Sequence, residues 1–207
     1  LAPLYGVTLP ADADFTTIRL DEGRRGGVLS HPYVMSVLSY PGSSSPIHRG
    51  VFLARTVLGN VLKPPRQAVA PLAADQAPDL TTRERVAAQT AATACQSCHT
   101  MINPLGFALE EFDAIGRYRS VERVGDLEKP VNASGSYTAR AGPSGTFTGA
   151  RELGAYCGSS HDAQEAFVQA LFHAVVKQPV RAWGPDALAG LHAAFERGGF
   201  DIRRLLV

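Results

Sequence analysis

The chain has 207 residues, of which 45% are hydrophobic and 19% are charged, and its formal net charge at pH 7 is +1. A chain of this size and composition can bury one sizeable hydrophobic core or two small ones. The near-neutral charge gives no indication of a basic surface that binds nucleic acid, so nucleic-acid binding is not expected. No apolar stretch is long enough to cross a bilayer, so a transmembrane segment is not expected either.

Residues 1–62 predict an irregular N-terminal segment that contains one helix. Within it, residues 15–20 have a strand-like pattern. Ser45 is expected to cap the helix, with Pro46 at its first position, and apolar residues recur at helical spacing until Pro64-Pro65 ends it. The Pro/Ala-rich composition of residues 63–80 then predicts a linker.

Residues 81–207 predict a mainly α region. Thr81 and Glu84 have the spacing of a capping box, which predicts a helix that delivers the following Cys/His motif at or near its end. The glycine-rich residues 131–149 predict a short β-hairpin, and Cys157 is expected to be a small buried residue at a helix end. Later helices are expected to begin near three residues, Asp162, Pro185 and Asp201.

Cys95-Gln-Ser-Cys98-His99 is the most informative motif of the chain. Two thiols at this spacing can each add across a haem vinyl group to give a thioether, and the adjacent histidine then lies under the iron as the proximal ligand. A zinc site of this kind needs a second Cys/His pair, and Cys157 has no partner beside it. A thioredoxin-like pair would follow a buried strand, whereas residues 83–93 are polar and alanine-rich. The motif therefore predicts one covalent haem c.

The residues after the motif are expected to support that haem. Pro104 should stop any helix through the motif, and its carbonyl is expected to accept the Nδ1 proton of His99. An apolar stripe should then form one face of a second helix that ends near Gly116. The stripe is expected to belong to the core, and Phe107 or Phe112 to touch the porphyrin edge as well. The stripe comprises Leu105, Ala108, Leu109, Phe112 and Ile115. Glu110 and Asp113, one turn apart, could hold a cation or orient Arg117, but a pair that faces solvent is expected.

The runs around the motif read RGGVLSHPYVMSVLSYPGSSSPIHRG, CQSCHTMINPLGFALEEFDAIGRYR, PVNASGSY and FTGARELGAY. Together they resemble the C-terminal haem region of the large planctomycete-type cytochrome c proteins, over nearly the whole chain. In that family the haem segment reads roughly CxxCHxxMDPxGFAxExFDxxGxxR. The matching residues are Cys95, Cys98, His99, Pro104, Gly106, Phe107, Glu110, Phe112, Asp113, Gly116 and Arg119. Two positions depart, since Ile102 stands where the family often has methionine and Asn103 replaces its aspartate.

The resemblance implies a cytochrome c-like helical haem domain with irregular loops and a short β-hairpin. It also implies that residues 1–62 end a larger upstream domain, because LAPLYGV is similar to the tail of the preceding domain in the family. In the bacterial systems that the family implies, haem is attached to CxxCH outside the cytoplasm, so a periplasmic or cell-surface location is expected. The expected partners are redox proteins or upstream domains of the same polypeptide.

The sixth coordination position of the iron decides between a carrier and a catalyst, and the sequence leaves it open. His48 is one candidate distal ligand, and His31 with Met35, one helical turn apart, is another. His173 is a weaker candidate, and Met101 is too close to His99 along the chain. Arg49, Arg117 and Arg119 are candidates for pairing with a haem propionate, and Arg119 is the first choice.

Three functions are consistent with the motif. An electron-transfer module within a larger extracytoplasmic redox protein is favoured over a stand-alone enzyme, because many c-type peroxidases use a second haem and this chain has one CxxCH. A catalytic haem domain of peroxidase or oxygenase type, with an open distal side, is the alternative. A module whose haem only staples the fold is the third.

Overall fold

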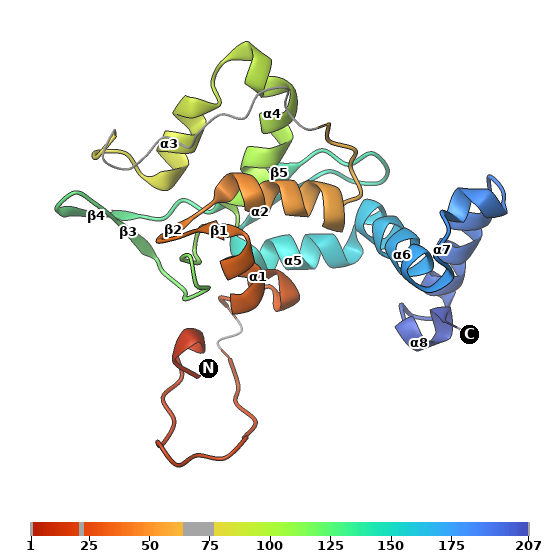
Figure 1. The fold of residues 1–207 in the computed structure, drawn as a ribbon, viewed down its shortest axis with the longest axis horizontal. Coiled ribbons are helices and arrows are strands. Elements are labelled where there is room, and N and C mark those ends of the chain that lie inside the picture. The colour runs from red at the N-terminus through yellow and green to blue at the C-terminus, as the bar shows by residue number, and fades with distance from the viewer. Residues whose placement is uncertain (1, 21–22, 64–76, 207) are drawn as a thin grey trace.

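A computed structural model describes residues 2–20, 23–63 and 77–206 of the chain. Over these residues the protein is mainly α, as the sequence predicts. It has eight α-helices and three two-stranded antiparallel sheets (Figure 1). Most of the predicted linker, residues 64–76, lies outside the described residues. The reading of residues 1–62 as the end of a larger domain stays a prediction.

The N-terminal part is built from short elements. Residues 15–20 form no strand, contrary to prediction, because their side chains are mostly exposed and no neighbouring strand pairs with them. The elements are the 3-10 helices Ala2–Tyr5 and Gly27–Ser30, α1 (Pro32–Val37), β1 (Ser39–Tyr40), β2 (Ser43–Ser44), α2 (Pro46–Phe52) and a π-helical turn, Leu53–Val57. Ser45 caps α2 as predicted, its side chain accepting a hydrogen bond from the His48 N–H. The helix ends earlier than predicted, and Val61 is 91% exposed.

The remaining elements follow the linker. They are α3 (Thr82–Gln89), α4 (Thr93–Phe107), β3 (Val121–Val124), β4 (Leu127–Pro130), β5 (Ser134–Tyr137), β6 (Gly145–Thr148), α5 (Gly149–Ser159), α6 (His161–Val176), the 3-10 helix Val180–Trp183, α7 (Ala187–Arg197) and α8 (Ile202–Leu205). The β5–β6 hairpin lies within the predicted residues 131–149, and α6, α7 and α8 begin within two residues of the predicted starts. The β3–β4 hairpin was not predicted.

Helix α4 differs most from the prediction. The capping box of Thr81 and Glu84 is present, but the helix that it begins, α3, ends at Gln89, and the Cys/His motif lies at the start of a separate helix. Pro104 does not stop α4, which continues for one more turn to Phe107. A proline inside a helix removes one backbone hydrogen bond at a cost of about 3 kcal/mol. Tertiary packing must offset that cost.

The packing partner of this last turn is α2, and the two helices meet backbone to backbone. A Cβ on Gly106 would overlap the carbonyl of Pro46, and a Cβ on Gly50 would overlap the carbonyl of Ile102. The two glycines therefore allow an approach that side chains would block, and this close contact packs α2 against the helix at and around Pro104.

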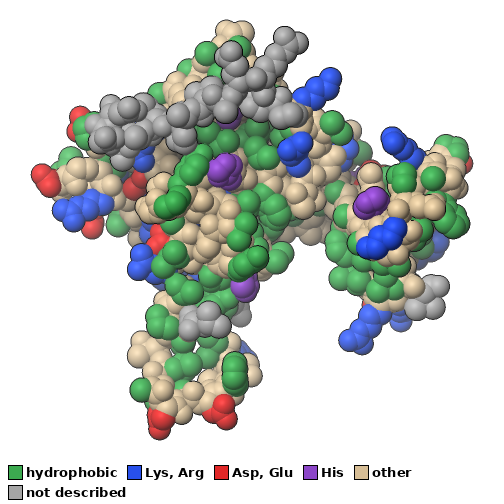
Figure 2. Space-filling model, in the orientation of Figure 1, with side chains coloured by type: hydrophobic (Ala, Val, Ile, Leu, Met, Phe, Trp, Pro, Cys, Tyr) green, Lys and Arg blue, Asp and Glu red, His purple; other side chains and the backbone are tan. Residues whose placement is uncertain are grey.

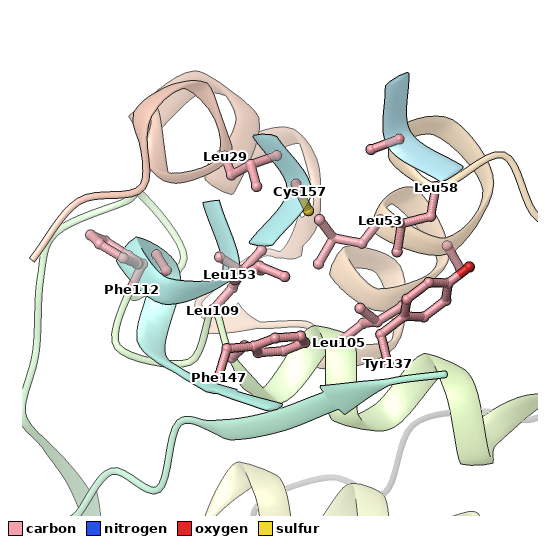
Figure 3. Close-up of a cluster of buried hydrophobic side chains, with 14 of the residues drawn as sticks. Leu29, Leu53, Leu58, Leu105, Leu109, Phe112, Tyr137, Phe147, Leu153 and Cys157 are labelled. Atoms are coloured by element: carbon pink, nitrogen blue, oxygen red, sulfur yellow. The ribbon is translucent and has the colours of Figure 1, made fainter. Parts of the chain in front are cut away.

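The hydrophobic core lies where α1, α2 and α4 meet α5 and the β5–β6 hairpin (Figure 3). The core is formed by side chains from segments that are far apart in the sequence. Those with no exposed surface include Met35, Leu53, Leu58, Leu105, Leu109, Phe112 and Leu153. Residues 108–116 form turns and not the predicted second helix, because α4 ends at Phe107. The members of the apolar stripe up to Phe112 are nevertheless buried as expected, whereas Ile115 is 44% exposed.

The C-terminal helices α6, α7 and α8 project from one end of this body (Figure 1). They enclose an apolar pocket of about 270 Å³ among Val168, Phe172, Leu191 and Leu205. Figure 2 shows hydrophobic side chains gathered over this end of the molecule. None of the helices in the described ranges combines the length and apolar character that crossing a bilayer requires.

Candidate functional site

Cys95, Cys98 and His99 lie in the first two turns of α4. Residues at positions i, i+3 and i+4 share one face of an α-helix, so both thiols and the imidazole face the same direction. All three side chains are half-buried, and both cysteines are free thiols. The helix therefore presents two nucleophilic sulfurs and one nitrogen ligand from a single surface.

The imidazole of His99 is held by a chain of hydrogen bonds that begins on α3. The Thr90 hydroxyl donates to the carbonyl of Val86 at 2.7 Å. Its oxygen then accepts from the Asn103 amide nitrogen, also at 2.7 Å. The Asn103 amide oxygen lies 2.8 Å from Nδ1 of His99.

This chain of hydrogen bonds fixes the tautomer of His99. The Val86 carbonyl can only accept, so the Thr90 hydroxyl proton points at it and the Thr90 oxygen must accept from Asn103. The amide of Asn103 is thereby oriented with its oxygen toward His99. Nδ1 of His99 must then carry the proton, and Nε2 carries the lone pair. No described residue is hydrogen-bonded to Nε2.

The sequence missed the role of Asn103. Pro104 was predicted to accept the Nδ1 proton, but its carbonyl lies against Gly135 of β5, and Asn103 is the acceptor instead. The reason is that α4 continues through Pro104, which places Asn103 one turn after His99 on the same face. The i,i+4 spacing of His99 and Asn103 was the available signal, and it applies only where the helix is unbroken.

The start of α4 is tied to the end of α3 by a second contact. Gln96 donates from its side-chain amide to the carbonyl of Thr90 at 2.8 Å. Thr90 therefore bonds both to the first turn of α4, through Gln96, and to its third, through Asn103. These contacts hold the corner between the two helices and with it the orientation of the Cys/His face.

Phe107 and Phe112 are both buried, in different surroundings. The ring of Phe107 lies under the guanidinium of Arg83, 4.3 Å from ring centroid to guanidinium carbon. Phe112 has no exposed surface and packs in the core against Tyr118, with ring centroids 5.9 Å apart. Their predicted contact with a porphyrin edge stays a prediction, as does a cofactor role for Pro104.

A buried ion cluster lies below α4 and was not foreseen. Glu110, expected to face solvent, is 2% exposed and accepts hydrogen bonds from Arg49, Arg119 and Ser44 at 2.7 to 3.1 Å. Burial raises the pKa of Glu110, and the charges of the two arginines oppose that rise. Asp113, its expected companion, instead pairs with Arg117 at 2.7 Å.

Arg49 is the centre of this cluster, with no exposed surface. Besides Glu110, its guanidinium donates to the carbonyls of Leu109, Phe112 and Asp113 at 2.7 to 2.8 Å. These carbonyls belong to the irregular turns that follow α4, where no helix supplies partners. Arg49 therefore anchors the chain beyond α4 onto α2.

Arg119 was predicted to pair with a haem propionate. In the structure its guanidinium donates to the carboxylate and the carbonyl of Glu110 and to Ser44, at 3.0 to 3.1 Å. Its side chain is 23% exposed. The propionate role stays a prediction, with donors of this guanidinium already engaged inside the protein.

The predicted distal ligands lie in two different environments. Met35 has no exposed surface and is part of the hydrophobic core. His48 is exposed and its ring packs at a tilt of 50° against Tyr40, with ring centroids 4.9 Å apart. Pro46 and Gly50 face α4. His48 is two residues from each of them along the helix, so its side chain points to the other side of α2. Neither is hydrogen-bonded to His99 in the described part of the chain.

Two other candidates and the zinc alternative can be placed as well. The ring nitrogen of His31 caps α1 by accepting from the Tyr33 N–H at 3.2 Å, and His173 lies exposed near the end of α6. Within the described residues, no cluster of three or more His, Cys, Asp or Glu side chains could hold a bare metal ion. Cys157 is buried near the end of α5, as predicted, and burial raises the pKa of its thiol to about 11.

Comparison with known proteins gives one match. No curated protein and no solved structure matches the chain. Residues 25–122, just under half of the chain, match the family model PSCyt3, described as a protein of unknown function (DUF1588). The matched range holds α3, α4 and the ion cluster around Arg49. Over the segment that builds the candidate site, the chain is therefore similar to the PSCyt3 family.

Proposed function

We propose that the chain is a c-type cytochrome module that binds one covalent haem and transfers electrons within a larger extracytoplasmic redox protein or complex. One observation carries the proposal. Cys95, Cys98 and His99 share one face of α4, and the imidazole is held with its Nε2 lone pair available as an iron ligand. The name of the matched family model, PSCyt3, is in keeping with this reading.

The residues on this face fit the chemistry of haem c. Each cysteine would attach by adding its S–H across a vinyl double bond, so that one S–C and one C–H bond form while one S–H and one π bond are lost. This addition balances without an oxidant or a leaving group. Neither thiol has a disulfide partner, and both are half-buried rather than enclosed, as attachment to a large planar group requires.

The haem would supply a one-electron iron couple, and the chain would hold it in place. His99 would be the proximal ligand through Nε2, while Asn103 and Thr90 fix the plane of its ring. A mainly α cytochrome c-like domain is the fold class that this arrangement implies. The expected location is periplasmic or cell-surface, and the expected partners are redox proteins or upstream domains.

One observation favours the alternative of a catalytic haem with an open distal side. Met35, a predicted distal donor, is wholly buried in the hydrophobic core, so using it would require the core to open. The electron carrier then needs its sixth ligand from another residue. The alternative needs none, since peroxide or oxygen would bind at that position.

Haem attachment is tested on the full chain produced in bacterial periplasm together with a haem-attachment system. We expect covalent haem, seen as peroxidase-active staining on a denaturing gel, in the wild type and in the matched control Cys157→Ala. The double variant Cys95→Ala/Cys98→Ala should lose the stain. Staining that persists in the double variant, or is absent from the wild type, would refute the proposal.

Absorbance spectra of the same material separate carrier from catalyst. A carrier with a filled coordination sphere should give low-spin spectra when oxidised and reduced, and it should bind carbon monoxide or cyanide slowly. A high-spin ferric spectrum with rapid ligand binding would favour the catalytic alternative. His48→Ala should convert low-spin to high-spin iron only if His48 supplies the sixth ligand, and His31→Ala and His173→Ala test the other two histidine candidates in the same way.

A further inference from the structure

We propose that Asn103, oriented by Thr90, sets the reduction potential of the haem iron by giving the Nδ1 proton of His99 a neutral acceptor. The inference rests on the proposed function. It goes beyond attachment, because it assigns a positioning role to two residues that do not belong to the CxxCH motif.

The first step is the nature of the acceptor. A ligating histidine almost always gives its second ring proton to an acceptor, and that acceptor controls how strongly the ring donates to the metal. A carboxylate would pull the proton strongly and give the ring imidazolate character. The acceptor here is the neutral amide oxygen of Asn103, 2.8 Å from Nδ1. A neutral acceptor leaves the ring a weaker donor, which favours ferrous over ferric iron.

The second step is the orientation of that amide. An amide that could flip would present its NH₂ group to Nδ1 and select the other tautomer, which protonates the nitrogen meant for iron. The buried Thr90 hydroxyl prevents this flip, because it is committed to the Val86 carbonyl and can only accept from Asn103. Thr90 therefore acts on the iron ligand through Asn103.

The chain offers a matched control for Thr90. Thr100 makes the same local bond, its hydroxyl donating to the carbonyl of Gln96 four residues earlier at 2.9 Å, but it is exposed and is not hydrogen-bonded to Asn103. Replacing either threonine with valine removes the same type of hydroxyl. Thr100→Asp is the control for Asn103→Asp. It adds a negative charge next to His99 in the sequence, but the new carboxylate does not accept the Nδ1 proton.

The test is the midpoint potential of the full haem-loaded chain, measured by spectroelectrochemistry. Asn103→Asp should shift the reduction equilibrium about tenfold toward ferric iron, which lowers the midpoint potential by about 59 mV for one electron. Asn103→Leu, which removes the acceptor, should raise it, and Thr90→Val should raise it by less. Thr100→Val should leave it unchanged, and Thr100→Asp should shift it by less than half as much as Asn103→Asp.

A second readout follows the hydrogen bond itself. In the reduced protein, with carbon monoxide added where the sixth position is open, the Nδ1 proton of His99 should give a resolved ring resonance after ¹⁵N-histidine labelling. Asn103→Asp should move this resonance downfield, and Asn103→Leu should make the proton exchange faster with solvent. A merely structural role of Asn103 would leave the resonance in place, and it would limit the potential shift of Asn103→Asp to that of Thr100→Asp.

Failures of the two proposals look different. A wild-type chain that carries covalent haem, with potentials of the Asn103 and Thr90 variants inside the range of the Thr100 controls, overturns the inference and leaves the proposed function standing. A wild-type chain without covalent haem overturns the proposed function itself. If Asn103→Leu does not fold, Asn103→Asp and Thr90→Val decide the matter.

Discussion

The guanidinium of Arg49 and the carboxylate of Glu110 meet 3.1 Å apart, with side-chain exposures of 0% and 3%. The two residues are 61 positions apart in the sequence, one on α2 and one just beyond α4. A buried ion pair adds little net stability by itself, since both charges lose their hydration. Here the arginine also donates to three backbone carbonyls and to the hydroxyl of Ser39, so its loss leaves five acceptors without this donor.

Arg49→Met should therefore be strongly destabilising. We expect the free energy of unfolding to fall by about 3–5 kcal/mol, the range for breaking a buried ion pair at one partner. The control is Arg117→Met, since Arg117 is 62% exposed and its pair with Asp113 should contribute at most about 1 kcal/mol. Urea denaturation measures both. Equal effects of the two substitutions would contradict a special role for the buried cluster.

Gly106→Ala should push α2 and α4 apart. The added methyl overlaps the carbonyl of Pro46, which belongs to the backbone and cannot rotate away, so a loss of about 1–3 kcal/mol is expected. Gly190→Ala is the matched control on α7, because its new methyl meets no atom within 4 Å. That change should stabilise the chain by up to about 1 kcal/mol through helix propensity. Thermal unfolding of both variants checks the opposite signs.

Asp162 makes stability depend on pH at acidic values. Burial acts to raise the pKa of this carboxyl, but hydrogen bonds from Tyr137 and the N–H groups of Arg140 and Ala141, with the charge of Arg140, hold the pKa below its ordinary value. Its stabilising contribution is thus fully present above the unfolded pKa of about 3.9 and is lost as the pH falls through the lower folded value.

Asp162→Asn should reduce the free energy of unfolding at pH 7 by about 1–3 kcal/mol, because the buried donors lose a charged acceptor. Below pH 4 the difference from the wild type should shrink. Denaturation curves at several pH values measure this convergence, with the exposed Asp12→Asn as control. A difference that stays constant down to pH 2 would argue against the lowered pKa.

The three thiols should differ in reactivity. Cys95 and Cys98 are half-buried at the start of α4, whereas Cys157 is 8% exposed and its thiol pKa is raised to about 11 by burial. In the folded chain without haem, a disulfide reagent at pH 8 should therefore modify two thiols quickly and the third only after unfolding in urea. Cys157→Ala should show two thiols with and without urea. Three fast thiols in the wild type would disprove the buried position of Cys157.

Local chemistry was readable from the sequence, and contacts between distant segments were not. The capping residues Thr81 and Ser45 act on N–H groups within three positions, so their effect does not depend on the rest of the fold. The cysteines and His99 were equally readable, because their spacing on one helix turn fixes their common face. Mainly α architecture followed from the same local signals.

Pro104 shows where such reasoning ends. Its intrinsic cost to a helix predicted a break, but α2 packs against that turn through Gly50 and Gly106, and no local pattern announces this contact. Because the helix continues, Asn103 lies on the same helix face as His99. The wrongly predicted helix end at Pro104 therefore hid Asn103 as the acceptor of the Nδ1 proton. Glu110 was misplaced for a similar reason, since its partner Arg49 lies 61 residues earlier.

The backbone contact between α2 and α4 has a consequence for how the site can vary. Where two helices are separated by side chains, substitutions of different size slide them apart or together, and anything mounted on one helix moves with it. At Gly50 and Gly106 the nearest groups across the contact are the carbonyls of Ile102 and Pro46, so backbone atoms set the spacing of the two helices. The contact therefore fixes the position of α4 relative to α2. The face with Cys95, Cys98 and His99 can be retuned by its immediate neighbours while its place against the core stays the same.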